Sequence, residues 1–384
     1  MTLAQTADRR LTEATASRAI PGVVAMATTA GGTIYEGAFG KASLTEDAPM
    51  ALDTVFHIAS MTKAITGAAA MQLVEQGRVG LDQPAGEIIP QLGEPKVLAG
   101  FDASGTPQLR PARGTITLRN LLTHTAGYAY DVWNPELARF YRITGLPAAR
   151  TGRLQALDAP LASDPGTRWE YGINIDWVGR IVEEVSGETL HDYMCAHIFA
   201  PLGMRDSGFI LRPDQHARRI PIHTRAADGS LTPQPLEPPR VPQFHNGGGG
   251  LHSTARDYLA FVRAILNGGA GILRPETVAL MGQNHIGALN VQPMLSQNRD
   301  ASCDVDLFPD MAVKWGLTFL INTEDVPGRR SAGSLAWAGL RNTYYWIDPK
   351  KQVGGVFMTQ VLPFADPTVL RCFAEFEQAV YAAL

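Results

Sequence analysis

The sequence predicts an α+β protein in which one antiparallel sheet is assembled from both ends of the chain. Two strand-like runs, 23–28 and 33–39, lie near the N-terminus and are separated by a glycine-containing turn. Three further strand-like runs lie near the C-terminus, and each end of the chain also carries a helical pattern. The middle of the chain consists mainly of helical patterns and long connections. Together these observations indicate a sheet flanked by helices and joined to a mainly helical part.

The individual elements follow from the periodicity of the apolar residues. An amphipathic helix is expected over 3–18, ahead of the two N-terminal strands. A second helix begins near Ser60 and is small and apolar almost all round up to Gly77, so we expect it to be buried. The expected C-terminal elements are strands over 313–321, 334–347 and 353–361 and a closing helix over about 367–383.

This order of elements predicts two domains. We expect residues 1–85 and 205–384 to form an α/β domain around the sheet, residues 86–204 to form a mainly helical domain, and the active site to lie at their interface. With 384 residues, of which 45% are hydrophobic, the chain can bury one large core or two joined ones.

Composition excludes several classes of function. The net charge of −4 and the scattered arginines leave no basic surface of the kind that nucleic-acid binding needs. The three cysteines are far apart and odd in number, which argues against a disulfide framework and suits a reducing compartment. No secretory signal and no run of about 18 apolar residues is visible. We therefore expect a cytoplasmic protein with neither a nucleic-acid nor a membrane partner.

The most informative motif is the pair Ser60 and Lys63 at the start of the apolar helix. Residues three apart lie on one face of a helix, so the hydroxyl and the amine can meet. A serine becomes a nucleophile when a neighbouring base takes its proton. Burial would lower the pKa of Lys63 and make the amine a usable base. A helix-capping serine followed by a solvated lysine is the structural alternative.

A second candidate is Tyr171, which stands on a loop just before a helix expected from Asn174 to Gly187. A phenol has a pKa near 10, and a nearby lysine cation would lower it and let the phenol shuttle a proton. The alternative is a buried tyrosine that bonds a carbonyl. Further along, Gly339 and its small neighbours on a predicted strand would allow a substrate to approach the backbone closely.

Other patterns mimic functional sites without their context. The glycine run 247–250 lacks the lysine and preceding strand of a phosphate-binding loop, and the residues after it predict a helix cap. His191, Cys195 and His197 lie on an ordinary amphipathic helix without companion ligands, so we predict no metal site. Ser334 lacks the glycines of a nucleophile elbow and is a poor candidate nucleophile.

Taken in order, these motifs resemble the class C β-lactamase-like serine hydrolases, and within them the family VIII carboxylesterases. The resemblance is collinear over nearly the whole chain and rests on residues 56–63, 121–127, Tyr171 with its helix, 201–204, 247–255 and 337–339. It implies a β-lactamase/transpeptidase-like fold, an acyl-enzyme mechanism without cofactor or metal, and a small-molecule ester as the substrate.

Carried over residue by residue, the resemblance implies Ser60 as the nucleophile, with Lys63 and Tyr171 acting together as its base. The main-chain N–H groups of Ser60 and Leu340 would form the oxyanion hole. The residues implied to line the substrate pocket are Tyr128, Trp133, Asp176, Trp337 and Gly339.

Departures from the β-lactamase pattern bear on the substrate. Trp337 takes the place of the lysine that would bind a substrate carboxylate, and Ile173 takes the place of the usual asparagine, with Asn174 one step out of register. Both changes make the site less polar and favour neutral esters. We therefore expect a serine carboxylesterase. The alternatives are an acyltransferase to an alcohol, like the lovastatin-type enzymes that the chain also resembles, a weak β-lactamase or D-aminopeptidase, and a non-catalytic ligand-binding relative; the oligomeric state stays open.

Overall fold

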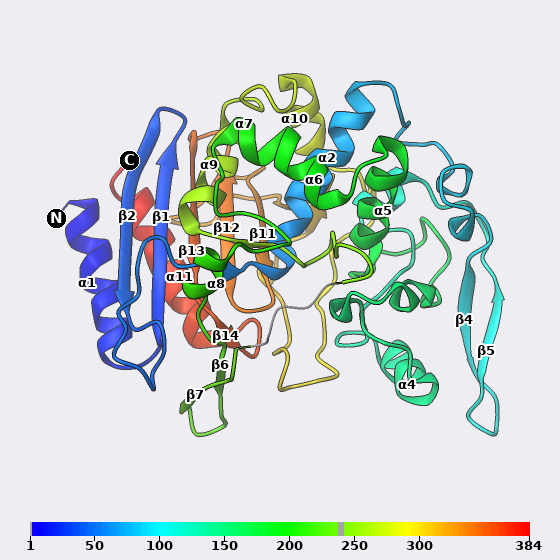
Figure 1. The fold of residues 1–384 in the computed structure, drawn as a ribbon, viewed down its shortest axis with the longest axis horizontal. Helices are drawn as coiled ribbons and strands as arrows, with labels where there is room; N and C mark the ends of the chain where they lie inside the picture. The colour runs from blue at the N-terminus through cyan, green and yellow to red at the C-terminus, as the bar shows by residue number, and fades with distance from the viewer. Residues whose placement is uncertain (1, 237–241) are drawn as a thin grey trace.

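A seven-stranded antiparallel sheet forms the centre of the computed structural model, which describes residues 2–236 and 242–384 (Figure 1). From edge to edge the strands are β2 (Gly32–Gly40), β1 (Gly22–Thr29), β13 (Val353–Met358), β12 (Thr343–Asp348), β11 (Leu335–Gly339), β10 (Leu320–Asn322) and β9 (Val313–Trp315). The N-terminal hairpin pairs with β13 near the C-terminus, as in the register Met26 opposite Val356. The predicted sheet from both ends of the chain is therefore confirmed.

All three predicted C-terminal strands were too long: two of them are each two strands, and the run 353–361 continues past the end of β13 at Met358. The run 313–321 is broken between β9 and β10, where Thr318 has a φ of 76°. The run 334–347 is broken between β11 and β12, where Asn342 has a φ of 59°. Both turn residues are fully buried. The loop before β10, residues 316–319, is apolar apart from Thr318, and the loop before β12 is only three residues long, so neither interrupted the strand pattern for long.

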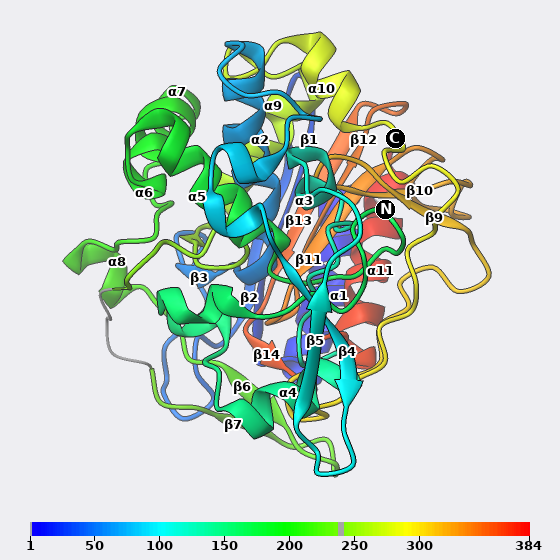
Figure 2. The same cartoon turned by 90° about the vertical axis from the view of Figure 1, so that its right-hand side faces the viewer.

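Helices cover both faces of the sheet (Figures 1 and 2). Neighbouring residues of β12 point to opposite faces: the ring of Trp346 contacts Phe373, and the ring of Tyr345 contacts Tyr258. These partners lie on different helices, since Phe373 belongs to α11 and Tyr258 to α9. The helices on the sheet are α1 (Leu3–Ala16) and α11 (Pro367–Tyr381), which pack together, and α9 (Ala255–Leu266). The predicted terminal helices are thereby confirmed.

Helix α2 (Thr62–Glu75) joins the sheet to the helices of the middle of the chain. It is buried from Thr62 to Leu73, as its small apolar residues predicted. Helices α3 (Leu118–Leu122) and α5 (Asn174–Ser186) belong to the segment expected to form the helical domain; α5 packs against α2, and α3 against α5. The division into two domains stays a prediction.

The remaining elements are short. They are β3 (Phe56–His57), β4 (Lys96–Phe101), β5 (Pro107–Pro111), α4 (Pro135–Thr144), α6 (Leu190–Met194), α7 (Ala200–Leu202), α8 (Pro213–Ala217), β6 (His223–Arg225), β7 (Leu231–Pro233), β8 (His252–Ser253), α10 (Pro275–Met281) and β14 (Val361–Leu362). Within the described ranges, no helix has both the length and the apolar character that a membrane crossing would require.

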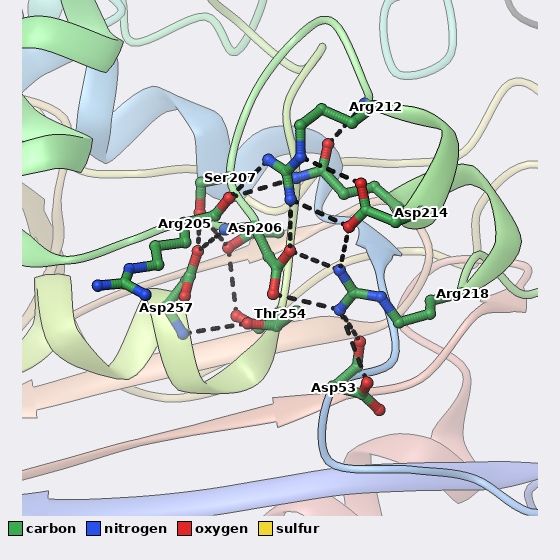
Figure 3. Close-up of polar contacts among 11 residues, drawn as sticks. Asp53, Arg205, Asp206, Ser207, Arg212, Asp214, Arg218, Thr254 and Asp257 are labelled. Atoms are coloured by element: carbon green, nitrogen blue, oxygen red, sulfur yellow. Dashed lines mark hydrogen bonds and ion pairs between the residues drawn. The ribbon is translucent and has the colours of Figure 1, made fainter.

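A polar network anchors the segment that returns the chain from the helical part to the sheet (Figure 3). Asp206 accepts hydrogen bonds from Arg212 and Arg218, at 3.3 and 2.5 Å. The backbone N–H of Asp206 donates to the carboxylate of Asp257, on the first turn of α9, at 2.7 Å. The network thereby ties residues 205–218 to a helix that lies on the sheet.

A second polar contact, between Arg330 and Glu377, is buried. The guanidinium donates two hydrogen bonds to the carboxylate, Nε to Oε1 at 2.7 Å and Nη2 to Oε2 at 2.8 Å. It fixes the connection between β10 and β11 to α11. The side-chain exposures are 4% for Arg330 and 0% for Glu377, so neither charge has water as an alternative partner.

We predict that Glu377→Gln lowers the free energy of unfolding by about 3–5 kcal/mol, because the buried Arg330 charge loses its partner. Urea unfolding followed by circular dichroism measures this. Arg299→Ala is the matched control: it breaks the exposed pair with Asp304 and should leave the free energy of unfolding nearly unchanged. Equal losses for the two variants would contradict the importance of burial.

Candidate active site

Ser60 lies in a 3-10 turn, Ala59–Met61, that leads directly into α2. The preceding residue, Ala59, has a φ of 44°, a backbone strain of the kind that concentrates at functional sites. The hydroxyl of Thr62 holds the turn by donating to the carbonyl of Ala59 at 2.6 Å. Ala59 and Met61 are buried, while Ser60 is partly exposed. The turn thus holds Ser60 partly exposed between two buried residues.

The amine of Lys63 lies within hydrogen-bond distance of the Ser60 hydroxyl. Nζ donates to Ser60 Oγ at 3.1 Å, to the phenol oxygen of Tyr130 at 3.2 Å and to the carbonyl of Gly248 at 2.6 Å. The side chain is fully buried. Burial lowers the pKa of Lys63 to about 7, although the nearby charge of Asp176 raises it. At neutral pH a substantial fraction of the amine is therefore free to accept a proton.

Tyr171 lies just before α5, near both Ser60 and Lys63. Its side chain is hydrogen-bonded to that of Ser60, and its oxygen accepts from the indole Nε1 of Trp337 at 2.8 Å. The Nζ of Lys63 lies 4.7 Å from the centroid of the Tyr171 ring. The expectation that Lys63 lowers the pKa of Tyr171 was wrong. Burial raises the pKa of Tyr171 above its ordinary value, so the phenol is neutral and can donate a proton.

Sequence reasoning selected Tyr128 for the pocket and missed Tyr130. Tyr128 is buried against Trp177, with ring centroids 6.2 Å apart, and among the described residues no hydrogen bond or ring contact joins its side chain to Ser60, Lys63 or Tyr171. Tyr130 instead reaches Lys63 because its backbone N–H donates to the carbonyl of Tyr171 at 3.0 Å. Only the two tyrosines in close succession could have signalled this, and that pattern does not tell which one faces the amine.

Aromatic rings surround Tyr171. The predicted pocket residues Trp133 and Trp337 have ring centroids 5.6 and 4.9 Å from it, and Trp169 stacks on it at 6.0 Å. The indole of Trp133 is held by Ser302, whose oxygen accepts from Nε1 at 3.1 Å. Trp133 and Trp169 also line a cavity of about 550 Å³, together with Asn134, Pro135, Thr167, Arg168, Glu170, Leu289, Asn290, Gln292, Pro293, Leu295 and Gln297.

Strand β11 ends beside the turn that carries Ser60. A Cβ at Gly339 would lie 2.2 Å from the carbonyl oxygen of Ile58, so only glycine allows this approach. The hydroxyl of Thr343 donates to the same carbonyl at 3.3 Å. Leu340 follows Gly339 directly, so the two amides expected to form the oxyanion hole, those of Ser60 and Leu340, lie on adjoining segments. Their role stays a prediction.

Two further residues lie behind the site instead of lining it. Asp176, expected in the pocket, is fully buried, and its Oδ1 accepts from the backbone N–H of Gly248 at 2.9 Å. Asn174 is also fully buried, and its amide contacts His124 Nδ1 at 2.9 Å and donates to the carbonyl of Tyr128 at 3.0 Å. Asn174 therefore supports loops around the site.

The glycine run serves close packing. Its carbonyls accept hydrogen bonds from α2, since Thr66 donates to Gly247 at 2.7 Å and Lys63 donates to Gly248. A Cβ at Gly247 would lie 2.9 Å from the carbonyl oxygen of Ile175. Thr254 caps α9, as predicted. Among the described residues, no group of three or more histidine, cysteine or acidic residues could hold a metal ion.

Comparison with known proteins places this geometry in a family. The family described as Beta-lactamase matches residues 7–376. The chain is 36% identical to monacolin J acid methylbutanoyltransferase of Aspergillus terreus, across 99% of this chain and 95% of that protein. It is 35% identical to lovastatin esterase of Penicillium rubens, across 90% of each. Unliganded simvastatin synthase from Aspergillus terreus has a similar structure, with a TM-score of 0.87, 33% identity and coverage of 100% of this chain and 98% of that chain.

These matches span nearly the whole chain and agree with the sheet and helices described above. The resemblance inferred from the sequence motifs is thereby confirmed at the level of family and fold. The chain belongs to the β-lactamase family, and it is an enzyme of that family's serine hydrolase and acyltransferase kind.

Proposed function

We propose that this enzyme transfers the acyl group of a carboxylic ester to a hydroxyl acceptor through an acyl-enzyme on Ser60. The observation that carries the proposal is the 3.1 Å contact between the buried amine of Lys63 and a partly exposed Ser60 hydroxyl. A serine with a neutral amine at hydrogen-bond distance can be deprotonated as it attacks a carbonyl.

In the proposed reaction, the Ser60 Oγ attacks the ester carbonyl while Lys63 takes the hydroxyl proton. The N–H groups of Ser60 and Leu340 stabilise the oxyanion of the tetrahedral intermediate. The intermediate collapses with cleavage of the bond to the alcohol, and the departing oxygen receives its proton from Tyr171, which is reprotonated from Lys63. An acceptor hydroxyl then reverses these steps, forms the new acid or ester and frees Ser60.

The surroundings of Ser60 favour an uncharged substrate. Trp337 stands where the β-lactamase pattern has a lysine, and its only polar hydrogen is donated to Tyr171. The indole therefore offers no cation to a substrate carboxylate. The neighbouring rings of Trp133 and Tyr171 supply apolar surface for an ester. This supports neutral esters over the carboxylate-bearing substrates of a β-lactamase or D-aminopeptidase.

The acceptor is either water or an alcohol, and the relatives support both. One similar protein is named as a lovastatin esterase, and another is named as a methylbutanoyltransferase acting on monacolin J acid. We propose that an alcohol competes effectively with water for the acyl group, because the chain is similar to the transferase along 99% of its length. Simple hydrolysis is the second candidate.

We predict that Ser60→Ala lowers turnover of short p-nitrophenyl esters by at least about 10⁴-fold and abolishes covalent labelling by a fluorophosphonate. Ser334→Ala is the control, because Ser334 is buried and its hydroxyl donates to the carbonyl of Ser331. Intact-protein mass spectrometry measures the labelling. If Ser60→Ala remained active and labelled, the nucleophile would be another residue.

The pH dependence of acylation follows from Lys63. The free amine is the active form, and the pKa of Lys63 is about 7, so kcat/KM for a p-nitrophenyl ester should rise with pH through about 7 and then level off. Stopped-flow or steady-state rates test this over a pH range that extends about two units on either side of the Lys63 pKa. Rates that are constant across this range would argue against Lys63 as the base.

The choice of acceptor predicts a product ratio. With a p-nitrophenyl ester as acyl donor and an added primary alcohol, the new ester should form in excess of free acid while p-nitrophenol release stays the same or rises. Mass detection of acid and ester measures the ratio. Free acid as the sole product at high alcohol concentration would leave hydrolysis as the function and refute the acyl transfer.

A further inference from the structure

A buried carboxylate stands directly behind the candidate base. Asp176 lies on the first turn of α5 and is fully buried. Its Oδ1 accepts from the N–H of Gly248 at 2.9 Å, and the carbonyl of Gly248 accepts from Lys63 Nζ at 2.6 Å. One peptide residue thus connects the carboxylate to the amine by two hydrogen bonds.

Among the described residues, the second carboxylate oxygen of Asp176 has no hydrogen-bond partner. This atom, Oδ2, is buried. A buried charge of this kind is costly unless an opposite charge lies nearby. Burial raises the pKa of Asp176 to about 6, while the nearby charge of Lys63 and the hydrogen bond from Gly248 lower it, so the carboxylate is charged at neutral pH. The ammonium form of Lys63 is its opposite charge, and the charge of Asp176 in turn raises the pKa of Lys63.

The other titratable groups around this pair are uncharged near neutral pH. Burial raises the pKa values of Tyr130, Tyr141 and Tyr171 above their ordinary value. Burial also lowers the pKa of His124, on the loop after α3, well below its ordinary value, so its imidazole is neutral. The field that acts on the Lys63 amine at neutral pH therefore comes mainly from Asp176.

We propose that Asp176 is a positioning residue, which acts through Gly248 to hold the Lys63 amine beside Ser60 and whose charge sets the pH at which that amine can take the Ser60 proton. This role rests on the proposed function, because it matters only if Lys63 is the base. It differs from the pocket-lining role expected from the sequence, since Asp176 reaches no solvent.

The identity of residue 248 supports this relay. A Cβ at Gly248 would lie 2.8 Å from Asp176 Oδ2 and 3.0 Å from Oδ1. Real Cβ atoms essentially never approach an atom within 3.0 Å, so any larger residue would push the carboxylate away from the backbone N–H. The glycine therefore permits the contact that joins Asp176 to Lys63.

The test is the pH dependence of Ser60 labelling by a fluorophosphonate in wild type and in Asp176→Asn. The asparagine oxygen can still accept from Gly248, but the negative charge that raises the pKa of Lys63 is gone. The midpoint of the rise in labelling rate should therefore move to lower pH, by about one unit or more. An unchanged midpoint in a folded variant overturns the proposal.

Asp257→Asn is the matched control. Asp257 is also a largely buried carboxylate on the first turn of a helix, and it also accepts from a backbone N–H, that of Asp206, within the network of Figure 3. Its removal should leave the midpoint where it is in wild type. An equal shift in this variant would mean that the effect is structural, which overturns the specific role of Asp176.

A measurement on the wild-type enzyme covers the case in which Asp176→Asn does not fold. With ¹³C at the lysine Cε, the NMR chemical shift of Lys63 plotted against pH should show two inflections, one from Lys63 and one from Asp176. A single inflection overturns the proposal. Failure of the proposed function gives different results: wild-type Ser60 would remain unlabelled at every pH if it were not the nucleophile, and free acid would be the sole product if no acyl group were transferred to an alcohol.

Discussion

Burial of the Lys63 amine is the constraint on which the rest of the site depends. A fully buried ammonium must have each of its three protons hydrogen-bonded, and Ser60, Tyr130 and Gly248 supply the three acceptors. The acceptors come from three distant parts of the chain, so α2 has to be packed tightly on several sides. This explains why its residues are small. At Gly67, for example, a Cβ would lie 2.4 Å from the hydroxyl oxygen of Thr318. The tight packing that buries the Lys63 amine thus also requires the small residues of α2.

The sequence predicted the parts of this arrangement that are local. Apolar periodicity gave the buried α2 and the terminal helices, and the spacing of Ser60 and Lys63 on one helical face placed the hydroxyl and the amine together. Contacts between distant segments could not be predicted in this way. Tyr130 owes its position to a backbone hydrogen bond with Tyr171, 41 residues further on, which no local pattern encodes. The extra strands escaped prediction for a related reason, because their connecting turns are short and the residues with positive φ, Thr318 and Asn342, are buried.

The electrostatics of the site also depend on packing more than on residue type. A lysine next to a tyrosine would lower the pKa of the phenol in water, but burial of Tyr171 has the larger effect and raises it. A neutral phenol keeps its hydrogen, and the indole N–H of Trp337 occupies a lone pair of the same oxygen. The phenol thus keeps a proton that the proposed mechanism can deliver to the departing oxygen. Replacement of the family's lysine by Trp337 thus removes a substrate cation and orients the phenol.

The same geometry bears on how an acyl-enzyme would divide between water and alcohol. In the proposed mechanism both acceptors are deprotonated by the amine of Lys63, because deacylation retraces acylation. The base therefore cannot discriminate between them, and selection has to come from binding beside Ser60. The rings of Trp133 and Trp337 beside Tyr171 offer apolar surface that a carbon-bearing alcohol can cover and water cannot. The ratio of transfer to hydrolysis should therefore depend on these aromatic rings, whereas the strength of the Lys63 base sets only the overall rate.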